Sequence, residues 1–161
     1  PARAVPALFS GIKLGTLAHD AGLTGQTFEK GTDGNAELLF RELPPTLDMV
    51  GTPRPHLGFT VNSRGGTSQA YSGLTWTIPL QGRFFSAIAL GAAAHDGRLV
   101  TQRGDAKGLG RRILFRAALE VGYRFSAQHQ ISIMADHVSN AGLADVNEGL
   151  DTIGIRLGYS F

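Results

Sequence analysis

Residues 112–125 restrict the fold more than any other stretch, because their side chains alternate between apolar and charged. The apolar side chains occupy the odd positions, Ile113, Phe115, Ala117, Leu119, Val121, Tyr123 and Phe125. The even positions include Arg116, Glu120 and Arg124. A period of two is that of a β-strand, whose successive side chains point to opposite faces. A face with two arginines and a glutamate suits the polar interior of a small barrel whose exterior is apolar.

The same alternation recurs along the chain and predicts eight strands. We expect them at residues 8–18, 34–42, 54–62, 68–80, 83–94, 112–125, 128–139 and 152–161. The segment 83–94 alternates least, because its two faces are almost equally apolar. The sequence therefore predicts an all-β protein, an eight-stranded antiparallel transmembrane β-barrel that forms one domain over residues 1–161.

The expected loops differ in length between the two rims of this barrel. An even number of strands places both ends of the chain at one rim, where the loops would be 42–53, 81–82 and 126–127. The loops at the other rim would be 19–33, 63–67, 95–111 and 140–150, most of them long. This asymmetry is typical of outer-membrane barrels, with the long loops outside the cell. Tyr123, Tyr159 and Phe161 would then belong to an aromatic girdle at the periplasmic interface.

The amino-acid composition excludes several other classes of protein and of site. No stretch approaches the roughly 18 consecutive apolar residues of a membrane helix, and the absence of cysteine excludes disulfides and thiolate metal sites. The net charge of +2 is too small to indicate a nucleic-acid partner. The opening PARAVPA looks like a mature N-terminus after signal cleavage. A soluble barrel of lipocalin type stays open, but it would turn its apolar face inward.

One cluster of polar side chains stands out on the expected outer face. His137 and Ser139 share the odd parity of Ile131 and Ile133, and Asp151 shares that of Ile153 on the next strand. Residues i and i+2 of a strand lie about 6.5–7 Å apart on one face, and cross-strand neighbours lie within side-chain reach. The three side chains would supply a nucleophile, a base and an orienting carboxylate. The alternative is that HVSN only caps a strand and Asp151 starts the next.

The polar residues near this cluster are expected to have other roles. Asp136 has the even parity of the interior, and Glu148 in the loop competes with Asp151 for the third role. Asn140, Gly142 and Asn147 are candidate oxyanion donors, or ordinary turn residues. The other histidines, at positions 19, 56, 95 and 129, lack ligand spacing, so we expect no metal site.

A basic loop before the strand at 112–125 is a candidate site for phosphate groups. Its cations are Arg98, Arg103, Lys107, Arg111 and Arg112. Arginine binds phosphate through paired, charge-assisted hydrogen bonds. A solvated basic rim is the alternative reading of the same residues.

The string HVSNAGL, followed by NEGLD and a last strand that ends in an aromatic residue, resembles the lipid A 3-O-deacylases of the PagL type. The resemblance is densest over about 109–161. It implies an outer-membrane barrel that hydrolyses the acyl ester at position 3 of lipid A, with His137 as catalytic histidine, Ser139 as nucleophile and position 151 as the acid. Asn147 and Gly142 would be the oxyanion donors, with Asn140 close by. The family usually has glutamate at position 151, where this chain has aspartate.

The resemblance also sets the expected location and partners. The protein would reside in the bacterial outer membrane, surrounded by its lipid, with lipid A or lipopolysaccharide as substrate and no cofactor. The oligomeric state, monomer or homodimer, stays open. The rival functions are a non-enzymatic structural or adhesive barrel and a soluble lipid-binding barrel.

Overall fold

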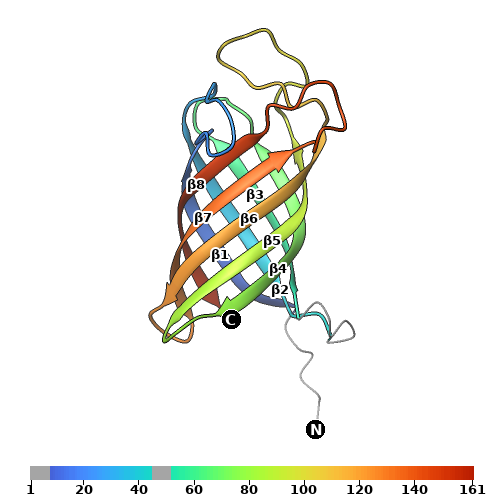
Figure 1. Cartoon of the computed structure of the whole chain (residues 1–161). Coiled ribbons are helices and arrows are strands. Elements are labelled where there is room, and N and C mark those ends of the chain that lie inside the picture. The colour runs from blue at the N-terminus through green and yellow to red at the C-terminus, as the bar shows by residue number, and fades with distance from the viewer. Residues whose placement is uncertain (1–7, 45–51) are drawn as a thin grey trace.

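The computed structural model describes residues 8–44 and 52–161, which form a closed barrel of eight strands (Figure 1). The strands are β1 (Phe9–Ala18), β2 (Thr32–Phe40), β3 (Arg54–Asn62), β4 (Gln69–Pro79), β5 (Phe84–His95), β6 (Ile113–Arg124), β7 (His129–Ser139) and β8 (Leu150–Ser160). Each strand pairs antiparallel with the next, and β8 pairs with β1 to close the barrel. The predicted number, order and antiparallel pairing of the strands are therefore confirmed.

The barrel is apolar outside and polar inside. Leu119 on β6 is 62% exposed, and Ile133 and Leu157 on β7 and β8 are each 59% exposed. The inward-facing Arg116 and Glu120 of β6 are only 2% and 4% exposed. This orientation contradicts a lipocalin-type barrel, which keeps its apolar face inside.

Ion pairs fill the interior of the barrel. Glu120 accepts from Lys13 at 2.7 Å and also from Arg156, whose guanidinium binds Glu37 at 3.1 Å. Buried charges persist in proteins when they are paired in this way. Arg116, which lines the same interior space, pairs with Asp136 at 3.0 Å. The prediction that Asp136 is an internal polar partner is therefore confirmed.

Strand β5 alternates weakly because its inward face is also apolar, and this face lies against the ion-pair network of the interior. The inward residues in the middle of β5 are small, with Ala87 and Ala89 3% and 8% exposed, whereas the inward Phe85 at the short-turn end is large. The two alanines line the narrow central space together with Arg116, Glu120 and Arg156. Alanine leaves room for these long side chains, so β5 faces a polar interior without being polar itself.

The two rims differ as expected. The short turns 80–83 and 125–128 lie at the rim that also carries the C-terminus, and the long loops 96–112 and 140–149 lie at the opposite rim (Figure 1). Rings cluster at the short-turn rim, where Tyr159 packs against Phe161 with centroids 5.7 Å apart. No helix among residues 8–44 and 52–161 is long and apolar enough to cross a membrane. The segment PARAVPA, expected to be a processed N-terminus, lies outside the described residues.

Candidate active site

His137 and Asp151 face each other on the outer wall, at the long-loop end of β7 and β8. They are directly paired across the two strands. His137 Nδ1 lies 2.7 Å from Asp151 Oδ1. The imidazole is 35% exposed, whereas the carboxylate is only 1% exposed. A carboxylate at Nδ1 favours the tautomer that carries its hydrogen there, which leaves Nε2 free to accept a proton.

The loop 19–31 covers Asp151. The backbone N–H of Thr24 donates to Asp151 Oδ2 at 2.7 Å, and the Thr24 hydroxyl donates to the same oxygen at 3.0 Å. Ala21 N–H donates to the backbone carbonyl of Asp151 at 2.8 Å. Thr24 is 127 residues from Asp151 in the chain, and no sequence pattern indicated this contact. The Thr24 hydroxyl also lies 3.2 Å from Asp151 Oδ1, the oxygen that contacts His137, so Thr24 and His137 together hold the carboxylate.

Ser139 lies two positions beyond His137 on the same outward face and is half-buried. Within the part of the chain that the structure describes, no hydrogen bond joins Ser139 Oγ to the imidazole. Catalytic hydrogen bonds are often long in the absence of substrate and tighten when it binds. The structure therefore brings a serine, a histidine and an aspartate onto one patch and directly connects the last two.

Glu148, the rival carboxylate, points elsewhere. Its Oε2 accepts from the backbone N–H of Gly108, and its own N–H donates to the Gly108 carbonyl at 3.2 Å. These bonds tie the 140–149 loop to the 96–112 loop. Glu148 therefore braces two loops, whereas Asp151 contacts the imidazole.

The turn after Ser139 contains the candidate oxyanion donors. Ala141 and Gly142 have φ values of 54° and 77°, and Leu143 N–H donates to the Asn140 carbonyl at 3.1 Å. Two consecutive positive φ angles are those of a tight type I′ turn. Gly142 is exposed at the tip of this turn, and its N–H has no partner among the described residues.

The two asparagines of this loop have different roles. The Asn140 side chain is buried and donates to the carbonyls of Leu109 and Val146 at 3.0 and 2.6 Å. Both of its amide hydrogens are thus used, which differs from the expectation of a free oxyanion donor. Asn147 is exposed, and its Oδ1 accepts from Asn140 N–H at 2.9 Å. That bond orients the Asn147 amide and leaves its hydrogens unbonded in the described structure.

Gly149 is a further residue of the site that the sequence did not indicate. Its φ is +62°, and a Cβ at this position would lie 3.0 Å from His137 Cε1. Such a contact is tight, so a side chain here would push against the imidazole ring. The absence of a side chain at position 149 lets the loop close over His137.

The five cations of the basic loop do not form one site, because they contact different parts of the protein. Lys107 is buried and forms an ion pair with Asp20 at 2.7 Å, so the expectation that it binds a phosphate is wrong. Arg103 is paired with Asp105 at 2.6 Å. Arg111 donates to the carbonyl of Leu143 at 2.7 Å and therefore lies beside the turn that follows Ser139.

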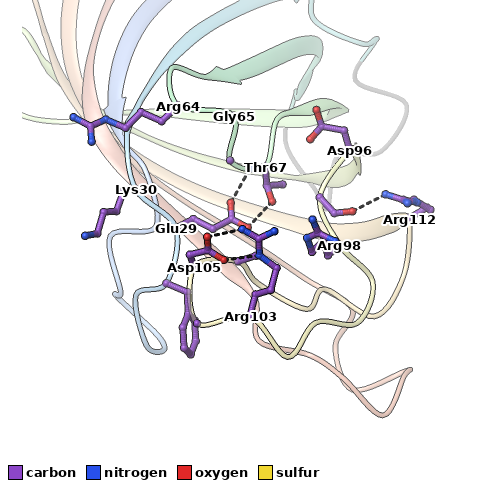
Figure 2. Close-up of a pocket in the computed structure, with 15 residues that line it drawn as sticks. Glu29, Lys30, Arg64, Gly65, Thr67, Asp96, Arg98, Arg103, Asp105 and Arg112 are labelled. Atoms are coloured by element: carbon purple, nitrogen blue, oxygen red, sulfur yellow. Dashed lines mark hydrogen bonds and ion pairs between the residues drawn. The ribbon is translucent and has the colours of Figure 1, made fainter.

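The remaining two cations of this set, Arg98 and Arg112, line a pocket at the mouth of the barrel (Figure 2). The pocket also includes Lys30 and Arg64, from loops that the sequence did not connect with a site.

A buried histidine anchors the loop that carries Thr24. His19 lies between Asp33 at 2.8 Å and Glu29 at 2.9 Å. Burial opposes the charged form of His19, but these two hydrogen bonds outweigh it and raise its pKa to about 9. Burial likewise opposes the charge of Glu29, but hydrogen bonds from His19 and from the N–H of Thr67 lower its pKa to about 2. The pair is therefore ionised at neutral pH.

An imidazolium has no lone pair for a metal, since both ring nitrogens carry hydrogen. Consistent with that chemistry, no group of histidine, aspartate and glutamate side chains in residues 8–44 and 52–161 is arranged to hold a metal ion.

Comparison with known proteins identifies the family. A sequence profile described as "Lipid A 3-O-deacylase (PagL)" matches residues 51–160, well over half of the chain. The chain belongs to the lipid A 3-O-deacylase (PagL) family. The matched region of this PagL-family chain includes His137, Ser139 and Asp151. A comparison with curated protein sequences gives no match.

Solved structures show the same fold at low sequence identity. The outer membrane enzyme PagL is 18% identical, with a TM-score of 0.70 over 92% of this chain and 98% of its own. The Yersinia pestis outer membrane protein Ail is 12% identical, with a TM-score of 0.54 over 96% of this chain and all (100%) of its own. Neisserial surface protein A is 10% identical, with a TM-score of 0.52 over 96% of this chain and 98% of its own. The fold of this chain is therefore that of eight-stranded transmembrane barrels.

Proposed function

We propose that this protein is an outer-membrane esterase that removes the 3-O-linked acyl chain of lipid A through Ser139, His137 and Asp151. The family match is the observation that carries the proposal. The hydrogen bond of 2.7 Å between His137 and Asp151 supports it, because it provides a base with an orienting acid next to a serine.

In the proposed reaction Ser139 Oγ attacks the ester carbonyl carbon while His137 Nε2 takes the hydroxyl proton. Asp151 keeps the imidazole in the required tautomer and stabilises the imidazolium that forms. The negative charge on the carbonyl oxygen would be met by Gly142 N–H and the Asn147 amide. The intermediate then collapses, the C–O bond to the sugar breaks, and His137 donates its proton to the departing sugar hydroxyl.

The second half of the reaction frees the enzyme. Water attacks the acyl group on Ser139, with His137 again accepting the proton. The bond to Ser139 breaks, the serine regains its hydrogen from His137, and a fatty acid leaves. The serine, the histidine and water supply every bond and proton of these two steps, so the proposed mechanism uses no cofactor.

The position of the patch suits an ester that lies within a membrane. The scissile bond of lipid A is at the boundary between sugar and acyl chains, in the outer leaflet. A nucleophile on the outer wall, beside the long loops, meets that boundary from the side. A lysine or arginine on the lipid face costs roughly 2–4 kcal/mol at the bilayer midplane but close to nothing near the interface, and a carboxylate costs less. Polar side chains are therefore tolerated at this height.

The aspartate in place of glutamate is compatible with this mechanism. The direct cross-strand pairing of Asp151 with His137 brings the shorter side chain within hydrogen-bond distance, and Thr24 holds its other oxygen. Arg111, beside the turn after Ser139, is a candidate contact for a lipid A phosphate.

Two substitutions at the reacting atoms test the function. Ser139→Ala and His137→Asn should each abolish release of the 3-O-linked acyl chain, measured by mass spectrometry of lipid A from cells that express each variant. Both residues lie on the outer wall, so both variants should still show the heat-dependent gel shift of a folded barrel. A wild-type protein that leaves lipid A unchanged, in cells and in detergent, would instead favour a structural or adhesive barrel.

A further inference from the structure

A second site lies at the mouth of the barrel, apart from the patch on the outer wall. It is a pocket of about 800 Å³, with walls from the loops 19–31, 63–68 and 96–112. None of its lining residues belongs to the proposed catalytic group, because His137, Ser139 and Asp151 face outward from β7 and β8. Its volume falls within the range of small-molecule sites, roughly 300–1,000 Å³.

The lining is rich in cations. The positively charged side chains are Lys30, Arg64, Arg98, Arg103 and Arg112, and the carboxylates are Glu29, Asp96 and Asp105. Figure 2 shows the cations spread around the opening, with the ion pair of Arg103 and Asp105 between them. The pocket therefore carries an excess of positive charge.

The carboxylates of the pocket are already engaged. Glu29 is buried and accepts from His19, from Thr67 and from the N–H of Lys107. Asp105 pairs with Arg103, and Asp96 Oδ1 accepts from Ser68 N–H at 2.7 Å. These three carboxylates therefore already have hydrogen-bond partners within the loops.

Several cations, in contrast, form no ion pair with a described residue, although Asp105 is near enough to Arg98 for their charges to interact. Arg112 donates only to neutral carbonyls, those of Gly97 at 2.6 Å and His95 at 3.5 Å. Within residues 8–44 and 52–161, no carboxylate lies within 4.0 Å of the charged groups of Lys30, Arg64 or Arg98. All four side chains are exposed. A ligand that brings negative charge would complete their interactions.

We infer that this pocket binds a phosphorylated saccharide. Guanidinium groups match phosphate oxygens with paired hydrogen bonds, and cations on three different loops suit a ligand with phosphates at more than one point. Phe28, the one aromatic residue of the lining, offers a face on which a sugar ring can pack. Gly65 leaves open space beside the charges, because a Cβ there would meet no atom within 4 Å.

Two consecutive arginines connect this pocket with the outer wall. Arg111 binds the carbonyl of Leu143, in the turn after Ser139, whereas Arg112 binds the carbonyl of Gly97 in the pocket. A lipopolysaccharide whose ester lies at Ser139 would extend its phosphorylated sugars over this rim and into the mouth. This identification of the ligand rests on the proposed function, but the binding of a phosphorylated sugar does not.

Direct binding is tested with glucose 1,6-bisphosphate as the probe, titrated into the full chain in detergent micelles and followed by calorimetry. We expect saturable binding of the bisphosphate and none of glucose. The double variant Arg64→Gln and Arg98→Gln should weaken the affinity by about tenfold or more. The matched control, Arg41→Gln and Arg83→Gln at the opposite rim, removes the same charge and should bind as the wild type does. An equal loss in both double variants, or no binding to the wild type, would overturn the proposal.

A second measurement distinguishes the sources of the ligand. If the pocket binds the sugars of the substrate, the Arg64→Gln and Arg98→Gln variant should raise the KM for lipopolysaccharide with phosphorylated core sugars severalfold. Its kcat should stay as in the wild type, because the pocket contains none of the three proposed catalytic residues. An unchanged KM together with weakened bisphosphate binding identifies a free sugar phosphate as the ligand. If the wild type binds the bisphosphate but has no esterase activity, the proposed sugar-phosphate site stands and the proposed function is wrong.

Discussion

The carboxylate of Asp151 is shared between the imidazole of His137 and the hydroxyl and N–H of Thr24. Its charge stabilises the imidazolium, and its oxygen selects the tautomer, so Asp151→Asn should lower kcat by roughly 10²–10⁴-fold. Asp151→Glu retains the charge and should keep most of the activity. Thr24→Val removes the hydroxyl but leaves the N–H bond, so its loss should be smaller. The measurement is turnover of lipid A by purified variants in detergent.

Glu148→Gln is the matched control for that series, because Glu148 binds Gly108 and not the imidazole. Its activity should stay within a fewfold of the wild type. An inactive Glu148→Gln beside an active Asp151→Asn would reassign the acid to the loop. Full activity of every carboxylate variant would leave a serine–histidine dyad.

Gly149 carries a second prediction at the scale of one residue. A Cβ here would lie 3.0 Å from His137 Cε1, so Gly149→Ala should displace the imidazole and reduce kcat by at least about tenfold. Gly82→Ala is the control, because its φ of +68° imposes the same backbone strain while a Cβ there meets no atom within 4 Å. Equal activity of the two variants would mean that Gly149 serves the turn and not the histidine. The readout is kcat at matched amounts of folded protein.

At the scale of the element, the loop 19–31 depends on the ion pairs of His19. Because the pKa of His19 is raised from 6.5 to about 9, its contribution is complete below pH 6.5 and is lost as the pH rises through 9. The increase in the pKa of His19 corresponds to a contribution of roughly 3 kcal/mol to the free energy of folding. Because the pKa of Glu29 is lowered from 4.5 to about 2, its contribution is complete above pH 4.5 and is lost as the pH falls through 2. The loop should be most firmly held between about pH 4.5 and 6.5.

Hydrogen exchange of two amides from neighbouring loops reports how firmly Glu29 of the loop 19–31 is held. The N–H groups of Thr67 and Lys107 donate to Glu29, so their protection factors should fall as the pH is raised past 9. Amides in the middle of β7 serve as the internal control and should keep their protection. A His19→Gln variant should show low protection at every pH. Protection that stays constant through pH 10 would contradict the role of the histidine charge.

At the scale of the whole molecule, the apolar exterior of the barrel should match the depth of a bilayer. Leu119 lies midway along β6 and is 62% exposed, whereas Ile113 starts the same strand at the long-loop rim and is 67% exposed. An arginine on the lipid face costs roughly 2–4 kcal/mol at the midplane and 0–1 kcal/mol near the interface. Leu119→Arg should therefore destabilise the barrel more than Ile113→Arg. Urea unfolding in lipid vesicles gives both free energies, and equal values would contradict this placement in the membrane.

Much of the fold could be predicted because the period of a strand is local. Alternation along residues 112–125 is enough to assign Arg116 inward and Leu119 outward, whatever the rest of the chain does. The same parity places His137, Ser139 and Asp151 on one face, since cross-strand neighbours share a face in any antiparallel pair. Both the barrel and the core of the candidate site therefore follow from a rule that operates between neighbouring residues.

The tertiary structure alone decided which loop residues meet. Thr24 binds Asp151 across 127 positions, and Lys107 is buried against Asp20 although it reads as one of five basic loop residues. The pocket likewise draws Lys30, Arg64 and Arg98 from three separate loops. Loop conformations have no period, since they are set by hydrogen bonds between distant segments and by which charges become buried. The sequence by itself determined the strands and their faces, and the packing of the long loops determined what surrounds the histidine and what fills the mouth.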